Sequence, residues 1–396
     1  MKLLTTILSL IVLSIINHEL STAFAQGSLA PAGAPAPTMK ALDQIEPRTL
    51  ISANLTPGNL TNAYIISQPG SYYLSGNIVV TNGNAILITT NAVTLDLNGF
   101  SICSIAPSAN GSAVTSDYLE SGILRQYISV MNGHILSGVT NLNGVYNGSG
   151  FANGVLLYGD HLDVEKVSVT GCLDYGIAMS SLLGITSVES CTVDNAGSYG
   201  ILAQNVRDST ATQCGQCGIY GFVVSQCYGQ SISGTGLNAY YSALNCYGNS
   251  AGSGDGLDCG NAENCMGQSQ SGTGLNCNYS AINCWGYCNS NGGGLYAGAG
   301  ASNCRGSSYG SGTGLASGGN VNNCIGYSTS GTGLYSPYTV TGCTGRSYSG
   351  LGLNATVAIG CYGYSETGTY GLAAYIANSC DHSGSAASIS FKYNMP

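Results

Sequence analysis

The C-terminal half of the chain repeats one pattern of apolar and small residues about every 19 positions. A cysteine recurs at spacings of 18 to 20 residues, and a Gly-Leu pair recurs between successive cysteines at nearly the same interval. A fixed period of about 20 residues is typical of a solenoid, in which each unit buries its apolar edge against its neighbours. The repeating cysteines are Cys227, Cys246, Cys265, Cys284, Cys304, Cys324, Cys343, Cys361 and Cys380.

Each coil is expected to turn three side chains inward: the leucine, the cysteine and an alanine three residues before the cysteine. Each would then stack on its own copy about 4.8 Å along the axis. Upstream, short β-rich runs at 65–66, 72–74, 78–80, 86–88 and 93–97 are separated by Gly, Pro and Asn, as strands are. Counting units from Ile78 predicts about 12 coils. The runs within 64–100 and 389–393 are expected to cap the two ends.

Two further residue types keep the period and predict corners. Asn directly precedes five of the repeating cysteines, and stacked Asn side chains at a corner can hydrogen-bond along the column. A glycine two residues after each cysteine, and the glycine before each leucine, are expected at corners that other residues would strain. Both sets of positions, and a serine column that follows the cysteines, are interpreted as structural. The corner asparagines are Asn245, Asn264, Asn283, Asn303 and Asn323.

Two N-terminal segments carry a resemblance to a known family. QPGSYYLSGNI at residues 68–78 and NAVTLDLNGF at residues 91–100 resemble the opening coils of secreted right-handed parallel β-helix proteins, the pectin-lyase-like superfamily in its broad sense. The lead-in at residues 36–49 resembles an uncharacterised bacterial subset of these proteins. The resemblance implies an all-β, single-stranded, right-handed parallel β-helix. One Gly-Leu pair per coil, and the handedness rule for parallel crossovers, also favour the right-handed form over a left-handed hexapeptide helix.

Composition and charge narrow the class of protein. Only 7% of the 396 residues are charged, whereas a globular domain has roughly 25%. The hydrophobic content of 44% argues against a disordered chain. A net charge of −9 with nine Lys and Arg argues against nucleic-acid binding, which needs a basic patch.

The N-terminus predicts export, and the chain divides into three parts. Residues 1–25 resemble a signal peptide, with Lys2, an apolar run over 3–16 and a cut expected after Ala25; an uncleaved membrane anchor is the alternative. Residues 26–60 form a Pro/Ala-rich extended lead-in. Residues 61–396 form the β-helix domain, with regular repeats over 227–380. No later apolar run reaches the length of a membrane span, so a secreted or cell-surface location is expected.

The 17 cysteines allow two interpretations. A disulfide framework is usual in small secreted domains. Twelve of these cysteines instead fall in or near the inward column, where stacked side chains run parallel, and this favours a ladder of unpaired thiols. Cys259 and Cys277 share another repeat position and could pair. Cys214 and Cys217 have the spacing of zinc ligands, but no second pair completes a metal site.

The sequence offers few candidates for catalysis. The motifs of pectinolytic members, such as Asn-Thr-Asp, Asp-Asp, Gly-His-Gly and Arg-x-Lys, are absent. The register places Glu165 beside Glu189 of the next coil, with Arg207 and Asp208 one coil further. Two stacked glutamates would raise one pKa or bind a cation, whereas a solvated outer face is the alternative we favour. Lyases of the family hold calcium with acidic residues, but no motif here indicates calcium or another cofactor. The charges gathered near Glu165 are Asp160, His161, Asp163, Lys166 and Asp174.

Two isolated titratable residues lie outside this cluster. Asp96 alternates with leucines and is interpreted as structural, and His134 has no partner that the sequence identifies.

The residue after each repeating cysteine forms a second outward stripe. Its aromatic members, Tyr228, Tyr247, Trp285 and Tyr362, could stack on sugar rings, although tyrosine also suits an exposed strand. The sequence therefore predicts a secreted, non-catalytic β-helix with a structural or adhesive role that binds a polysaccharide or cell-surface glycan. One alternative is a polysaccharide lyase or hydrolase using Glu165 and Glu189, and another is a structural protein without a ligand. The oligomeric state is not assigned.

Overall fold

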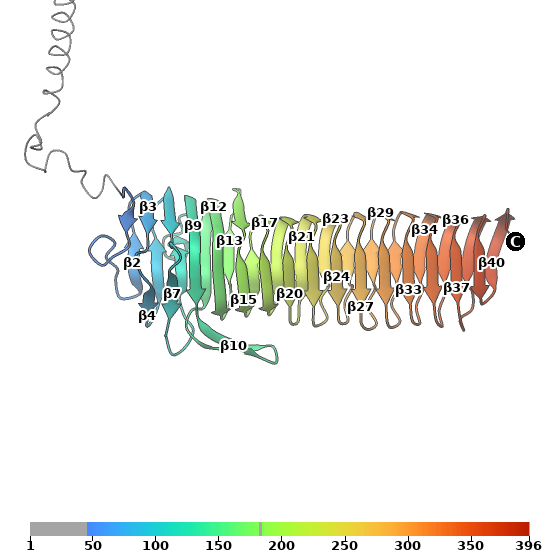
Figure 1. Ribbon diagram of the computed structural model, residues 1–396, viewed down its shortest axis with the longest axis horizontal. Coiled ribbons are helices and arrows are strands. Elements are labelled where there is room, and N and C mark those ends of the chain that lie inside the picture. Colours follow the sequence, from blue (N-terminus) through green and yellow to red (C-terminus); the bar gives the residue numbers. More distant parts are fainter. Residues whose placement is uncertain (1–45, 182–183, 396) are drawn as a thin grey trace, which may run out of the picture. The chain divides into compact units, whose positions relative to one another are not determined.

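The computed structural model describes residues 46–181 and 184–395. From Arg48 onward, short parallel strands joined by tight corners stack in three columns (Figure 1). This is the parallel β-helix that the sequence predicted. It makes about 18 turns, so the expected count of about 12 is wrong. The count was too low because the N-terminal turns have irregular lengths and lack the repeating cysteine. The right-handed winding stays a prediction.

Strands of the first column begin near the leucine of each Gly-Leu pair and pair in register with the next turn. The longer strands continue around a corner into the second column. The members are β2 (Asn62–Ile66), β5 (Asn84–Ile88), β8 (Ser112–Ser116), β12 (Asn153–Cys172), β13 (Ile177–Ser180), β16 (Tyr199–Leu202), β19 (Cys217–Ser225), β21 (Thr235–Leu244), β23 (Leu257–Glu263), β25 (Leu275–Cys277), β28 (Leu295–Ala297), β31 (Leu315–Ser317), β34 (Leu334–Thr341), β36 (Leu353–Ile359), β38 (Leu372–Asn378) and β40 (Ala387–Tyr393).

The second column contains the inward alanines and stacks 17 strands from β1 to β40. It shares β12, β19, β21, β23, β34, β36, β38 and β40 with the first column. Its other members are β1 (Thr49–Leu50), β3 (Gly70–Tyr73), β6 (Val93–Asp96), β9 (Arg125–Leu136), β14 (Thr186–Glu189), β17 (Asn205–Arg207), β26 (Ser280–Ile282), β29 (Gly300–Ser302) and β32 (Asn320–Asn322).

The third column begins one residue after each repeating cysteine of the regular half. It also includes the last parts of β9 and β12. Its other members are β4 (Ile78–Val80), β7 (Ser101–Ser104), β15 (Thr192–Ala196), β18 (Thr210–Cys214), β20 (Tyr228–Ser231), β22 (Tyr247–Ser250), β24 (Met266–Ser269), β27 (Trp285–Cys288), β30 (Arg305–Ser308), β33 (Ile325–Ser328), β35 (Thr344–Ser347), β37 (Tyr362–Ser365) and β39 (Asp381–Gly384).

Both ends of the β-helix differ from the expectation. The expected signal peptide and most of the lead-in lie outside the described residues. The strand β1 lies inside the stretch expected to be an extended lead-in, yet it pairs with β3, so the β-helix begins before residue 61. The segments expected to be caps are themselves turns of the helix, since β2 to β6 and β40 belong to the stacked columns.

The interior matches the predicted stacking. In the turn that starts at Leu257, the inward side chains of Leu257, Ala262 and Cys265 are 0–3% exposed. Each pairs or stacks with the same residue type one turn later, as Leu257 does with Leu275 and Ala262 with Ala281. Because every turn repeats the same inward residues, burial of the whole column follows from burial of one unit.

The predicted asparagine corner is confirmed. Asn264, Asn283 and Asn303 have φ values of 53–54°, in the left-handed region that asparagine tolerates better than most residues. The amide of Asn283 donates to the side-chain oxygen of Asn264 at 3.2 Å, and Asn303 donates to Asn283 at the same distance. Gly342 and Gly360 take the same corner in later turns with φ of 61° and 59°.

The corner role predicted for the glycine two residues after each cysteine is wrong, whereas a glycine before the leucine, such as Gly294, does lie at the bend that precedes its strand. Gly286 and Gly306 lie inside strands, are buried, and do not have the positive φ of a corner. A Cβ on Gly286 would lie 2.1 Å from the carbonyl oxygen of Gly294, the glycine that precedes the leucine of the same turn. The two glycines therefore let the backbones meet across the narrow interior, where no side chain fits.

A β-hairpin leaves the solenoid between β9 and β12, and the sequence analysis missed it. It consists of β10 (Gly138–Leu142) and β11 (Val145–Ser149), which pair antiparallel around Asn143-Gly144, a strong signal for a two-residue turn. Figure 1 shows it beside the lower edge of the stack. The Tyr146 hydroxyl donates to the carbonyl of Gln213 at 2.6 Å, which fixes the hairpin to later turns. The one helix with described bounds is α3 (Tyr118–Ser121).

Candidate functional site

The charged residues predicted near Glu165 do come together on the outer face of the second column. Glu165 pairs in register with Glu189, and Glu189 with Arg207. Each glutamate nevertheless has its own cation: Lys166 forms an ion pair with Glu165, and Arg207 forms one with Glu189. These carboxylates raise the pKa of Lys166 and of Arg207 through hydrogen bonds. The stack is therefore an alternating ion-pair ladder on an open face rather than a pair of free carboxylates.

Other charges around this ladder have structural partners. Burial, and then the negative charges of Glu165 and Glu189, raise the pKa of Asp163. The Asp160 side chain accepts a hydrogen bond from Ser181 at 2.7 Å. Asp96 forms an ion pair with Arg48 at 2.7 Å and accepts from the backbone of Asn98, which supports its structural interpretation.

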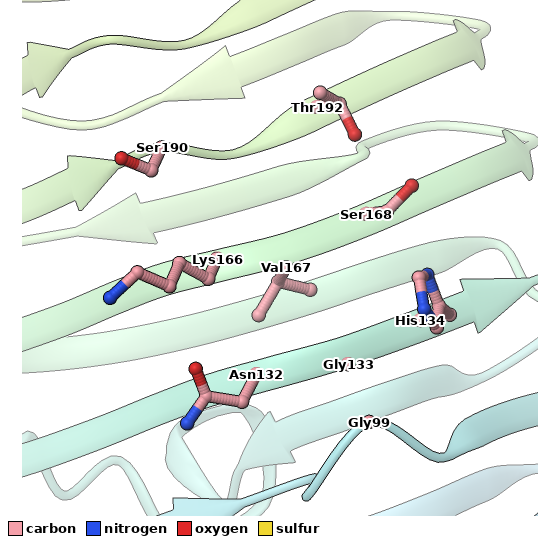
Figure 2. A pocket seen from close by; sticks show the side chains of 9 residues that line it. All are labelled: Gly99, Asn132, Gly133, His134, Lys166, Val167, Ser168, Ser190 and Thr192. Atoms are coloured by element: carbon pink, nitrogen blue, oxygen red, sulfur yellow. The ribbon is translucent and has the colours of Figure 1, made fainter.

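A shallow pocket of about 310 Å³ lies beside this ladder, over β9, β12 and the start of β15. Figure 2 shows Lys166 and Asn132 at one end and His134 at the other, with Ser168 and Thr192 along the later turns. His134, Ser168 and Thr192 are partners in register. The pocket lining contains no carboxylate, and the Lys166 ammonium is held by Glu165. It can therefore offer hydroxyl and imidazole groups to a ligand, but it holds no acid–base pair.

A pair of aspartates that the sequence analysis missed lies on the outer face of the first column. Asp258 stands in register between Asn238 and Asn276. The Asn238 amide donates to Asp258 at 2.9 Å, and the Asn276 amide donates to Asp255 at 3.0 Å. Burial, followed by the charge of Asp255, raises the pKa of Asp258 to about 6. The available signal was a departure from the repeat, because this turn has Asp255 where others have threonine.

A groove of about 460 Å³ on the outer face of the third column combines two arginines with tyrosines. Arg305 and Arg346 stand two turns apart, roughly 10 Å along the axis at 4.8 Å per turn. Both side chains are exposed, and neither forms an ion pair within residues 46–181 and 184–395. The guanidinium of Arg305 lies 5.6 Å from the ring centre of Trp285, which is a cation–π contact.

One small residue, Ser307, lies beneath the tyrosines at this end of the groove. Ser307 pairs in register with Tyr287 on one side and Tyr327 on the other. The ring of Tyr309 lies between these two tyrosines, with centre-to-centre distances of 5.1 and 5.6 Å. Ser307 is 1% exposed and its hydroxyl has no hydrogen-bond partner. The tyrosines thus form an apolar wall beside the two cations, and an unsatisfied hydroxyl lies beneath them.

The predicted aromatic stripe lies on this same outer face. Tyr228 and Tyr247 stack at 5.1 Å, and Met266 and Trp285 follow in register. After Trp285 the column continues through Arg305, Ile325 and Thr344 to Tyr362, so the groove lies between the two aromatic ends of the stripe. The structure confirms that this stripe, Trp285 included, faces outward, whereas its role in ligand binding stays a prediction. The presence of Arg305 and Arg346 in one groove was not predicted.

The described residues contain neither a metal-binding cluster nor a membrane-spanning helix. No group of three or more His, Cys, Asp or Glu residues between 46 and 395, apart from the gap at 182–183, is arranged to hold a metal ion. In the same part of the chain, no helix has the length and apolarity needed to cross a membrane.

Comparison with known proteins returns one likeness in fold. No family model matches the chain, and no curated protein matches it. Among solved structures, the A-module of the mannuronan C-5 epimerase AlgE4 from Azotobacter vinelandii aligns with 83% of this chain and 89% of its own, at 12% identity and a TM-score of 0.33. The chain's own fold defines the class of protein, which is a parallel β-helix. Cysteines stack in its interior, and asparagines stack at one corner. The candidate functional side chains lie on the outer faces.

Proposed function

We propose that this chain is a secreted, non-catalytic β-helix that binds a polysaccharide along the outer face of its third column. The observation that carries the proposal is the groove with unpaired Arg305 and Arg346 beside Tyr309 and Tyr327. Tyrosine rings offer flat apolar surfaces to the C–H faces of sugars. Guanidinium groups in the same groove favour a ligand with carboxylate or sulfate substituents.

The non-catalytic part of the proposal is supported by the ion-pair ladder. Glu165 and Glu189 were the candidates for acid–base work, and each is neutralised by a cation on an open face. A glycoside hydrolase needs one carboxylic acid and one free carboxylate across the bond. The ladder provides neither.

The first prediction concerns the two arginines. Replacing both Arg305 and Arg346 with glutamine is expected to weaken polysaccharide binding by at least tenfold, because each charged hydrogen bond is worth about 1.5–3 kcal/mol. Binding can be followed by the fluorescence of Trp285, the only tryptophan of the chain. Its ring contacts Arg305, so a ligand that engages this arginine changes its surroundings.

The matched control for this experiment is Arg207→Gln, which removes an exposed arginine of the second column that already has Glu189 as a partner. It should leave binding unchanged. Equal losses in both variants would point to general charge attraction. No binding by the wild-type chain across acidic and neutral polysaccharides would remove the proposal and leave a structural protein.

A second function is favoured by the pair Asp255 and Asp258. A carboxyl with a pKa of about 6 beside a second carboxyl can share acid and base roles with it, as polysaccharide-cleaving enzymes require. The test is release of oligosaccharides from a polysaccharide panel. Activity that disappears in Asp258→Asn and persists in Glu165→Gln would establish this function in place of the non-catalytic one.

The same variant gives a stability prediction that does not depend on any substrate. The folded pKa of Asp258 lies above the ordinary value of about 3.9, so the folded state holds the proton more tightly. The raised pKa of Asp258 therefore favours the folded state at low pH, and this contribution to the free energy of unfolding is lost as the pH rises from about 4 to 6. Asp258→Asn should therefore be more stable than wild type at pH 7, by about 1 kcal/mol after allowance for solvent screening, and equal to it at pH 4. Thermal unfolding at the two pH values measures this; a loss of stability at pH 7 would contradict it.

A further inference from the structure

The inward column next to the Asp258 turn contains two cysteines on neighbouring turns. Cys259 and Cys277 pair in register, both side chains are buried, and their sulfur atoms lie 3.1 Å apart. From Ala239 to Ala374, this position of the column otherwise contains only small residues. From turn to turn it runs Ala239, Cys259, Cys277, Ala297, Ser317, Ser336, Ala355 and Ala374.

These two sulfurs differ from those of the cysteine ladder. In the ladder, the sulfur of Cys304 accepts the backbone N–H of Cys284 at 3.4 Å and donates to the carbonyl of Ser302 at 3.2 Å. A disulfide within the ladder would therefore remove the S–H hydrogen that the sulfur donates to a backbone carbonyl. Among the described residues, the sulfurs of Cys259 and Cys277 have hydrogen-bonding contact only with each other. A bond between them would cost no such contact.

We propose that Cys259 and Cys277 form a disulfide that joins two successive turns, an inference that rests on the proposed secretion. Adjacent strands separated by about 4.8 Å fall within the Cα separations that disulfides span. Two S–H bonds break and one S–S bond forms, while two electrons and two protons pass to a disulfide oxidant such as oxidised glutathione, which is reduced to two thiols. Because both thiols are buried in the finished fold, the bond forms during folding.

The bond would stiffen the turn that carries Asp258. Residues 257–259 and 275–277 hold Asp258 and Asn276 on their outward sides, and the disulfide would fix the same two strands from within. It closes a loop of 18 residues, a length for which cross-links stabilise proteins through restriction of the unfolded chain.

The test uses the full mature chain, unfolded, reduced and then refolded in a glutathione redox buffer. It is next denatured with an alkylating agent and no reductant, and analysed by mass spectrometry. We expect all but two of the 17 cysteines to be alkylated, with one linked peptide pair containing Cys259 and Cys277. Alkylation of every cysteine, or linkage between other residues, would overturn the proposal.

A variant keeps the proposal testable at the level of stability. The double change Cys259→Ala and Cys277→Ala introduces the residue that this column already has at Ala239 and Ala297. Addition of a reductant should lower the melting temperature of wild type by several degrees and leave that of the double variant unchanged. Equal responses would overturn the proposal. Since refolding in vitro needs no export, a failed disulfide is distinguishable from a failed secretion or glycan proposal.

Discussion

Gly286→Ala is expected to destabilise the chain strongly for the addition of a single methyl group. The added Cβ would lie 2.1 Å from the carbonyl oxygen of Gly294 and 2.9 Å from the Cα of Leu295. Both neighbours are backbone atoms, so relief requires the turn itself to widen. Overpacking of this kind costs about 1–3 kcal/mol or more, and we expect the upper part of that range. Denaturant unfolding followed by circular dichroism measures the loss.

The control lies in the same turn. A Cβ on Gly293 would be 3.6 Å from its nearest neighbour, the carbonyl oxygen of Thr313, which is an ordinary contact. Other turns place threonine at this position. Gly293→Ala should therefore change the free energy of unfolding by no more than about 0.5 kcal/mol. If the two alanine variants proved equally stable, the narrow interior would not be the reason for the glycine pattern.

Cys304→Ala is expected to lower the free energy of unfolding by about 1–3 kcal/mol, and Cys304→Ser by less. Alanine leaves the buried N–H of Cys284 without its acceptor, since the Cys304 sulfur accepts it at 3.4 Å. Serine can replace that acceptor, because Ser209 already does so in an earlier turn. There the Ser209 oxygen accepts the N–H of Cys191 at 3.1 Å and donates to the carbonyl of Arg207 at 2.7 Å.

The order of the two variants distinguishes two roles of the ladder cysteine. If the sulfur acts mainly as a small apolar group, serine should be worse than alanine, because it buries a hydroxyl. If it acts mainly as a hydrogen-bonding partner, alanine should be worse. Burial raises the pKa of the ladder thiol Cys191 to about 11, so this thiol keeps the proton that it donates. Chemical denaturation of both variants, compared with wild type, gives the order directly.

Several features of the fold could be predicted because they repeat. The inward leucine, alanine and cysteine needed only the period, since each copy stacks on the next. The corner at Asn283 was predictable because asparagine is one of the few residues that accept a positive φ. The register of Glu165 with Glu189 followed from aligning two adjacent coils.

Other features were missed because the sequence does not show what crosses the interior. A glycine two residues after each cysteine is a residue type expected at corners. Only the structure shows that a Cβ on Gly286 would meet the backbone of Gly294. The hairpin around Asn143-Gly144 had a turn signal, but its docking through Tyr146 joins residues 67 positions apart. The N-terminal turns were undercounted because their irregular lengths hide the period.

The sequence by itself determined that this chain is a parallel solenoid with stacked inward residues, because a period of one turn makes every neighbour predictable from a single unit. Only the tertiary structure decided where the chain departs from the repeating unit to form candidate sites. Arg305 and Arg346 are 41 positions apart, and turn lengths vary from 18 to 20 residues. The place of both arginines in one groove, and the register of Asp258 with Asn276, depend on how each corner folds. The outer faces do not repeat strictly, because packing does not constrain them, and the candidate sites lie there.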